Sequence, residues 1–195
     1  MSELQIPLFP LNTVLFPGGP LPLRIFEPRY LDMVSACMKH GTGFGVCLIR
    51  AGKEIGAAAT PYDIGTLAEI VDWHQRPDGL LGITVIGRQR FRVSAVTVQP
   101  DQLALARVTL LPDEPECAVA QSYLPMVQSL QRILEQIGQP YAYLPRHYDN
   151  ACWVGYRLAE LLPIDLLQKQ YFLQLDDPLQ RLERLQEVLK GLGML

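Results

Sequence analysis

The sequence lacks the features of a membrane span, a secretory leader and a nucleic-acid-binding surface. It has no apolar run of about 18 residues, the length that a membrane helix needs. Its first residues include Glu3 and several prolines, where a signal peptide has basic charge and an unbroken apolar stretch. The 17 Lys and Arg residues are fewer than the 20 Asp and Glu residues and form no cluster. Because nucleic-acid binding depends on neutralised phosphates, we expect a cytoplasmic protein with neither a nucleic-acid nor a membrane partner.

The sequence also lacks the motifs of nucleotide-dependent and nucleophilic enzymes. No G-x-x-x-x-G-K-[ST] loop, G-x-G-x-x-G loop or G-x-S-x-G elbow occurs. Cys37 and His40 could supply two metal ligands from one helix, but a site needs three or four that converge. Cys152 begins a predicted helix, where a thiolate is favoured, although a buried packing cysteine is the better interpretation. We predict a protein that is not an enzyme, with no catalytic residue, metal or cofactor.

The sequence is rich in apolar residues. Of its 195 residues, 49% are apolar and 19% are charged, whereas an average protein has about 25% charged residues. This balance favours a large core or an exposed apolar surface, which could serve a protein partner or another copy of the chain. The four cysteines have irregular spacings without a C-x-x-C pair, as is typical of reduced, buried cysteines.

Residues 1–112 have the pattern of a β-rich subdomain. Short runs rich in Val, Ile and Thr alternate with Gly and Pro clusters, which favours a barrel or a sandwich. The predicted strands are Leu4–Phe9, Leu21–Ile25, Gly43–Ile49, Ile64–Asp72, Leu80–Ile86, Gln89–Val98 and Leu103–Leu110. Pro77-Asp78-Gly79 predicts a hairpin turn, and Gly87 predicts a second tight turn. One inserted helix begins at Pro28 and ends at Gly41.

Residues 118–195 have helical periodicity and predict a bundle of about four helices. Asp149 or Asn150, Asp165 and Asp177 are predicted N-caps, and Pro163 ends a helix. The apolar stripes favour faces turned to a core, with docking of a partner helix as the alternative. The acidic, proline-rich stretch 112–116 is the expected boundary between the two subdomains.

Some apolar and aromatic residues lie where a regular core element is not expected. The stretch 7–19 is apolar yet contains three prolines and two glycines, so it predicts a strand with a buried loop or, alternatively, an exposed apolar lip. Aromatic side chains with a polar tip in loops suit protein interfaces. The predicted partner-binding residues are Phe16, Tyr62, Trp73, His74, Tyr141 and Tyr143.

Several motifs resemble a known family. They are Pro7-Leu8-Phe9-Pro10-Leu11, Val14-Leu15-Phe16-Pro17-Gly18, Leu23-Arg24-Ile25-Phe26-Glu27-Pro28-Arg29-Tyr30, Gly43-Phe44-Gly45-Val46, Gly65-Thr66-Leu67-Ala68-Glu69-Ile70, Gly87-Arg88-Gln89-Arg90-Phe91-Arg92-Val93 and Leu158-Ala159-Glu160-Leu161-Leu162-Pro163. Together they resemble the N-terminal, substrate-binding domain of the Lon proteases, and the likeness runs from about Leu4 to Leu192.

This resemblance implies an α+β fold, with a PUA-like β-barrel subdomain followed by an α-helical bundle subdomain. It carries no ATPase or protease residues, so neither activity is expected. It implies a non-enzymatic module that recognises unfolded or specific partner proteins, such as an adaptor in protein quality control. The alternatives are an RNA-binding PUA-like module, which the acidic charge disfavours, and a barrel that binds a small molecule in its mouth. Glu27, Arg29, Arg24, Glu69 and Arg90 are expected to pair internally or to contact a ligand.

Overall fold

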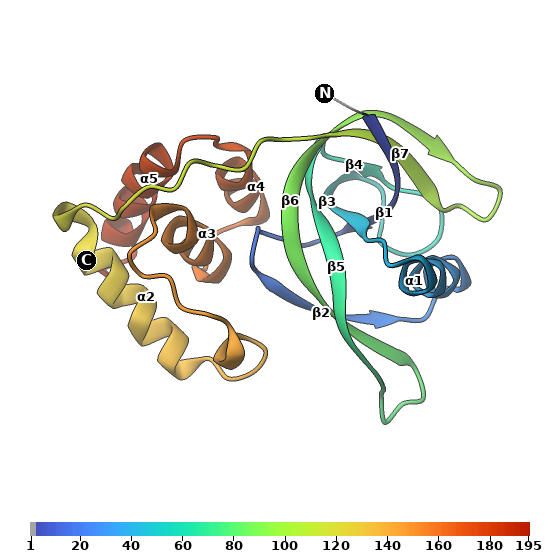
Figure 1. The fold of residues 1–195 in the computed structure, drawn as a ribbon, viewed down its shortest axis with the longest axis horizontal. Helices are drawn as coiled ribbons and strands as arrows, with labels where there is room; N and C mark the ends of the chain where they lie inside the picture. The colour runs from blue at the N-terminus through green and yellow to red at the C-terminus, as the bar shows by residue number, and fades with distance from the viewer. Residues whose placement is uncertain (1–2) are drawn as a thin grey trace. The chain divides into compact units, whose positions relative to one another are not determined.

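The computed structural model describes residues 3–195, which form two compact units. The first unit runs to Asp113 and contains all the strands, and the second comprises Glu114–Leu195 and is helical (Figure 1). The chain is thus a mixed α+β protein with a ring of strands, as the sequence predicts.

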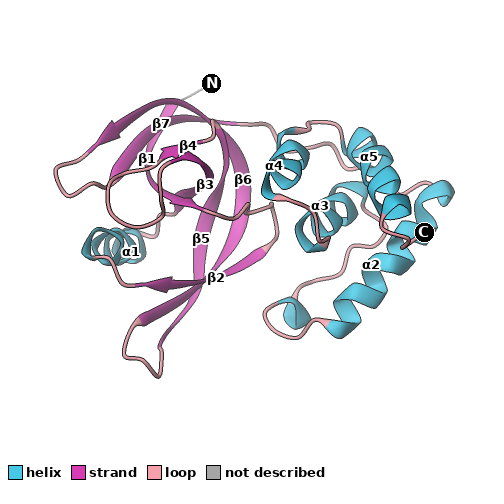
Figure 2. Cartoon of the chain, turned by 180° about the vertical axis from the view of Figure 1, so that it is seen from behind, coloured by secondary structure: helices cyan, strands magenta, loops and turns pink. Residues whose placement is uncertain are grey.

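The β unit has seven strands and one helix. The strands are β1 (Glu3–Leu11), β2 (Pro20–Ile25), β3 (Phe44–Ala51), β4 (Thr60–Pro61), β5 (Ile64–Gln75), β6 (Leu81–Val98) and β7 (Ala104–Leu110). Their hydrogen-bonded order is β1-β7-β6-β5-β3-β4, and β1 also pairs in parallel with β3, which closes the ring. β2 pairs antiparallel with the first part of β6. Figure 2 shows the ring of strands and the β5–β6 hairpin that projects from it.

Apolar side chains cover both faces of this sheet, because neighbouring residues of a strand point to opposite faces. Leu8 belongs to a cluster with Phe91 and the alanines of β7. Its neighbour Phe9 belongs to a larger cluster with Phe44 and α1. In the loop after β1, Val14, Leu15 and Phe16 are buried. This confirms the prediction of a strand followed by a buried loop, and not the alternative of an exposed apolar lip.

The helix α1 (Pro28–His40) has the predicted bounds. Pro28 stands in its first turn, where the missing N–H leaves no partner unsatisfied. Gly41 ends it in the left-handed conformation, with φ at 64°. Tyr30, Met33 and Val34 point from its buried face into the larger apolar cluster, whereas Leu31 and Met38 of the same helix are exposed.

One prediction for this unit is wrong: Gly87 makes no turn. β6 runs unbroken from Leu81 to Val98 and pairs with β2, β5 and β7 along its length. The N–H of Gly87 donates to the Gly19 carbonyl at 2.9 Å, and a Cβ on Gly87 would lie 2.2 Å from the Phe16 carbonyl oxygen. Glycine is needed here for the close approach of the loop after β1, a role that a single sequence does not separate from a turn.

The helical unit contains four α-helices and two short 3-10 helices within the described chain. They are η1 (Gln121–Tyr123), α2 (Leu124–Gln136), η2 (Tyr141–Tyr143), α3 (Ala151–Leu161), α4 (Leu166–Gln174) and α5 (Pro178–Gly191). The three predicted caps are present: Asn150 accepts from the Trp153 N–H, Asp165 forms a capping box with Gln168, and Asp177 accepts from the first turn of α5. Each cap satisfies backbone donors that a helix start leaves free.

Candidate functional site

The outer edge of β5 is open over much of its length. β3 pairs with β5 only from Thr66 to Ala68, whereas β6 pairs with it as far as Gln75. Within residues 3–195, no strand pairs with the other side of β5 from Glu69 to Gln75. An open edge carries main-chain donors and acceptors that can bind another strand.

The hairpin turn shows which residues of β5 face outward. Arg76 N–H donates to the Leu80 carbonyl at 2.9 Å, and Gly79 takes the positive φ of 79° that closes the turn. Main-chain groups of alternate residues in an antiparallel pair point toward the partner strand and away from it. The main-chain N–H and C=O groups of His74 and Arg76 therefore point toward β6, and those of Trp73 and Gln75 point to the open side.

An apolar pocket of about 450 Å³ lies beside this edge. Its walls come from the end of α1, the turn that follows and the middle of β5: Cys37, Met38, Gly41–Gly43 and Leu67–Trp73, with Arg88 from β6. Trp73 is 60% exposed, and Val71 and Met38 are also exposed. Arg88 and Glu69 form an ion pair with 2.5 Å between Nε and Oε2, so the wall of the pocket carries little net charge from them.

A second pocket of the β unit, about 280 Å³ in volume, lies where β2 leads into α1. Phe9 and Tyr30 stack with ring centroids 3.9 Å apart and form part of its wall. Phe26 and Ile55 are exposed in the same lining, and two carboxylates, Glu27 and Glu54, contribute to it. The loop that carries Glu54 covers part of this pocket.

The helical unit has a shallow groove of about 590 Å³ over α4 and α5. Leu167 and Tyr171 of α4 are exposed in it, beside Val188 of α5. Of its three charged lining residues, Arg184 and Glu187 form an exposed ion pair at 3.7 Å, and Asp165 caps α4. No strongly one-signed charge marks this groove.

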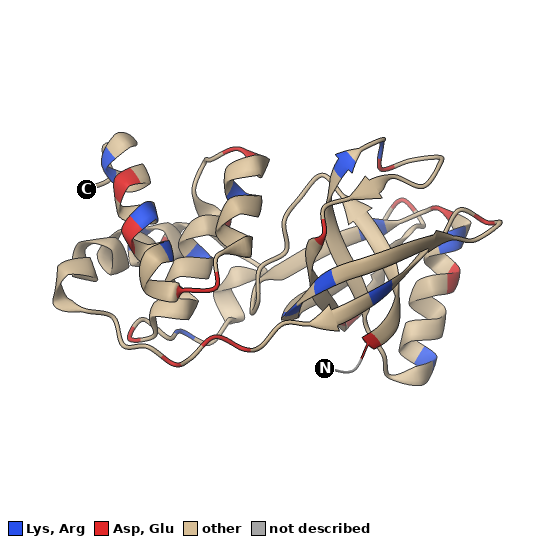
Figure 3. Cartoon of the chain, turned by 90° about the horizontal axis from the view of Figure 1, so that it is seen from above, with Lys and Arg blue, Asp and Glu red and all other residues tan. Residues whose placement is uncertain are grey.

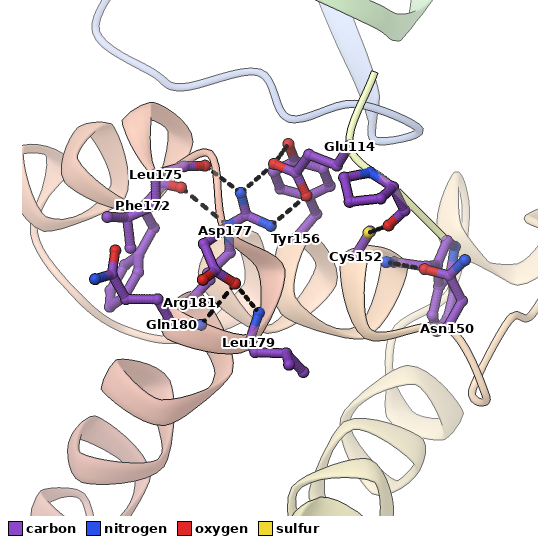
Figure 4. Close-up of polar contacts among 12 residues, drawn as sticks. Glu114, Asn150, Cys152, Tyr156, Phe172, Leu175, Asp177, Leu179, Gln180 and Arg181 are labelled. Carbon is purple, nitrogen blue, oxygen red and sulfur yellow. Dashed lines mark hydrogen bonds and ion pairs between the residues drawn. The ribbon is translucent and has the colours of Figure 1, made fainter. Parts of the chain in front are cut away.

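The most polar cluster of the helical unit is structural (Figure 4). The Arg181 side chain is 0% exposed, pairs with Glu114 and donates to the carbonyls of Phe172 and Leu175. Its guanidinium lies 4.0 Å from the centre of the Tyr156 ring. Burial alone would lower the pKa of Arg181, but the Glu114 carboxylate raises it overall. A buried arginine with these partners fastens Glu114 and α4 to α5.

The cysteines do not form a reactive thiol site. Burial, followed by the charge of Glu114, raises the pKa of Cys152 to about 11. The Cys152 thiol donates to the Pro115 carbonyl at 3.3 Å, so the favourable field of the α3 N-terminus is outweighed. Burial raises the pKa of Cys47 to about 12. In the part of the chain that the structure describes, no group of three His, Cys, Asp or Glu residues could hold a metal ion, and Cys37 with His40 gains no third ligand.

The structure divides the six predicted partner-binding residues between the two units. Trp73 lines the larger pocket of the β unit, while His74 covers Gly82 on β6. Tyr62 is half-buried beside β4, and its N–H donates to the Leu48 carbonyl at 2.8 Å. Phe16 is 0% exposed, so a partner cannot reach its ring in this conformation.

The remaining two tyrosines belong to η2 of the helical unit. Tyr143 is 78% exposed, and its hydroxyl accepts a hydrogen bond from Gln139 at 3.1 Å. Tyr141 is half-buried, and burial together with the nearby Glu160 raises its pKa above the usual value. Neither residue lines one of the pockets described above.

Sequence reasoning missed several surface residues that the fold brings to these pockets. Met38 is one of several apolar residues of α1 and carries no signal of its own, and Glu54 and Ile55 lie in a loop without a motif. The charged residues of the family motifs form internal ion pairs: Arg24 with Asp78, Glu27 with Arg29, and Glu69 with Arg88. A glutamate within a polar loop carries no sequence signal for a pocket, because only the folded loop brings it there.

The comparisons with known proteins agree with this architecture. The family model described as the ATP-dependent protease La (LON) substrate-binding domain matches residues 5–191. The chain belongs to the Lon substrate-binding domain family. The solved Lon N-terminal domain protein from Xanthomonas campestris is similar, with 37% identity, a TM-score of 0.79, and coverage of 94% of this chain and 98% of that one.

Two curated relatives of this Lon-domain chain are longer proteins. The Lon protease of Porphyromonas gingivalis is 34% identical over 56% of this chain, which spans 13% of that protein. The protein cereblon of Danio rerio is 29% identical over 66% of this chain, which spans 31% of it. The chain therefore matches a module that occurs within larger proteins. None of the helices among residues 3–195 has the length and apolar character needed to cross a membrane.

Proposed function

We propose that this chain binds extended, apolar segments of other polypeptides at the open edge of β5 and catalyses no reaction on them. The observation that carries the proposal is the coincidence of this edge with the apolar pocket beside it. A strand added to the edge gains main-chain hydrogen bonds whatever its sequence, and a pocket for alternate side chains adds selectivity. The family match to a substrate-binding domain supports the same role.

Unfolded polypeptides offer the two features that this surface requires. Their main-chain groups are free to pair with a strand edge, and their apolar side chains are not yet buried. Trp73 is the natural anchor, since it is large, 60% exposed and part of the pocket wall, and exposed tryptophans often dominate binding energy. We propose that the chain acts in this way as an adaptor in protein quality control in the cytoplasm, where its four free cysteines would stay reduced.

The two alternative functions have weaker support. Figure 3 shows basic positions mixed with acidic ones over both units, whereas RNA binding requires a basic surface that follows the phosphates. A small molecule in the barrel would need an interior cavity, and apolar side chains fill both faces of the sheet.

The test uses the two tryptophans of the chain, Trp73 in β5 and Trp153 in α3. In a Trp153→Phe variant, Trp73 is the sole indole, and its emission is recorded while reduced, carboxymethylated lactalbumin is added as a permanently unfolded probe. We expect a saturable shift of the emission to shorter wavelength as Trp73 is buried. Trp73→Ser should weaken binding about tenfold or more, measured by calorimetry, and Val98→Ser, an exposed residue at the end of β6, should leave it unchanged.

Backbone pairing is tested separately with two versions of one apolar peptide, N-methylated on odd or on even residues. Only alternate residues of an added strand direct their main-chain N–H groups at β5, so we expect one version to bind and the other to fail. Unchanged Trp73 emission with the unfolded probe, or equal binding by the wild type and Trp73→Ser, would exclude the proposed surface.

A further inference from the structure

The smaller pocket of the β unit combines apolar walls with a carboxylate that has no cationic partner. Glu54 forms no ion pair with any residue of the described chain, and its Oε1 accepts from the Asn12 N–H. Glu54 is a half-buried residue in a lining that is otherwise mostly apolar.

The other charged groups of this pocket are already paired. Glu27 accepts from Arg29 at 2.9 Å, and the Arg29 side chain is 4% exposed. Arg24 points to Asp78 of the hairpin turn at 3.6 Å. With these pairs neutralised, Glu54 sets the sign of the potential in the pocket. Burial raises the pKa of Tyr30, which lines the same pocket; Arg29 opposes this effect, and Glu27 and Glu54 add to it.

We propose that this pocket takes the side chain of one Lys or Arg residue from a bound peptide segment. The volume of about 280 Å³ suits a single side chain better than a drug-sized molecule, which usually needs about 300–1,000 Å³. Long basic side chains place their methylene stem on apolar surface and keep the charged head on a polar group. Leu23, Phe26 and Ile55 would contact the stem, and Glu54 would receive the head.

The desolvation of Glu54 decides between a basic and a purely apolar occupant. An apolar side chain in this pocket would remove water from the carboxylate and return no hydrogen bond, which costs free energy. A guanidinium or ammonium group replaces the lost water with a charged hydrogen bond. The preferred ligand is therefore a basic residue with apolar neighbours.

This inference rests on the proposed function only for the origin of the ligand, so a short probe can test it alone. The probe is the tripeptide acetyl-Leu-Arg-Leu-amide, compared with the same peptide carrying citrulline, which has the shape of arginine without its charge. Binding is followed by NMR through the methyl group of Ile55, which is exposed at the pocket. We expect saturable shifts with the arginine peptide, about tenfold weaker binding of the citrulline peptide, and a loss of affinity with added salt.

Two variants test whether Glu54 causes the preference for the arginine peptide. Glu54→Gln keeps an acceptor for the Asn12 N–H and should make the two peptides bind equally. Glu135→Gln, which alters an exposed glutamate of the helical unit that lines none of the pockets described above, should preserve the tenfold difference. Equal binding of the two peptides to the wild type, or an unchanged ratio in Glu54→Gln, would refute the inference.

The two proposals fail in different ways. An unfolded probe that shifts Trp73 while no basic peptide moves Ile55 would leave the proposed function standing and refute the basic pocket. Shifts of Ile55 with the arginine peptide and no response of Trp73 to unfolded polypeptide would do the reverse.

Discussion

The interiors of the two units differ in the kind of side chain that they bury. In the β unit, the largest fully buried side chains are Phe16, Phe44 and Phe91. In the helical unit they are two arginines, Arg157 and Arg181, each 0% exposed. An apolar interior is stabilised by burial without a specific partner, whereas a buried arginine is tolerated only with its carboxylates and carbonyls in place. Stability in the helical unit should therefore depend on a few single contacts, and in the β unit on volume and close packing.

The largest expected effect comes from breaking the ion pair of Arg181. Arg181→Met removes the cation from the Glu114 carboxylate, which stays buried because the Glu114 side chain is 5% exposed. We expect the free energy of unfolding of the helical unit to fall by about 3–5 kcal/mol. Urea denaturation followed by Trp153 fluorescence in a Trp73→Phe background measures this loss.

Two controls sharpen this prediction. Arg184→Met, on the same helix but 50% exposed, should change the stability by less than about 0.5 kcal/mol. Adding Glu114→Leu to Arg181→Met should recover part of the loss, because no charge then remains buried. A double variant no more stable than Arg181→Met would contradict the account of the buried pair.

A smaller effect is expected from a methyl group added at Gly87 of the β unit. The new Cβ would lie 2.2 Å from the Phe16 carbonyl oxygen, so strand and loop must separate, which costs about 1–3 kcal/mol. Urea denaturation followed by Trp73 fluorescence in the Trp153→Phe background measures it. Gly138→Ala of the helical unit, where a Cβ meets nothing within 4 Å, should be almost neutral when unfolding is followed by Trp153 fluorescence in the Trp73→Phe background. A neutral Gly87→Ala would show that the loop adapts easily and that this unit is less tightly packed than we infer.

The smallest effect concerns the pH dependence of the helical unit. The pKa of Cys152 rises from 9.0 to about 11 on folding, mainly through burial, so the fold favours the neutral thiol. This contribution to stability is complete below about pH 9 and is lost as the pH rises through about 11. Cys152→Ala should therefore flatten the decline in urea midpoint over that range. Cys117→Ala is the matched control, and an equal flattening in both variants would remove Cys152 from the explanation.

Elements with local signals could be predicted from the sequence. Pro28 and Gly41 mark the ends of α1, and Asn150, Asp165 and Asp177 each cap the helix that follows. These signals depend on the hydrogen bonds of one helical turn, which lie within a few residues of the cap. The motifs that resemble the Lon substrate-binding domain are likewise contiguous, and the family model confirms them.

Features that depend on distant residues could not be predicted. Gly87 was predicted to form a turn. Its actual role is to allow the close approach of the loop at Phe16, which lies about 70 positions earlier and gives no signal near Gly87. Glu114 belonged to an expected linker, yet it pairs with Arg181 inside the helical unit. Of the candidate site, Trp73 could be named from the sequence, but Met38, Glu54 and Ile55 acquired their places only in the fold.

The sequence by itself determined the class of each half, the ends of most helices and the family. Periodicity, caps and contiguous motifs are properties of neighbouring residues, and they survive without knowledge of the fold. The tertiary structure alone decided which edge of β5 stays open, which glutamate is left without a cation and which arginines are buried. Those properties depend on contacts between residues far apart in the chain. Such contacts decide which charges are buried, and burial of a charge without a partner costs free energy.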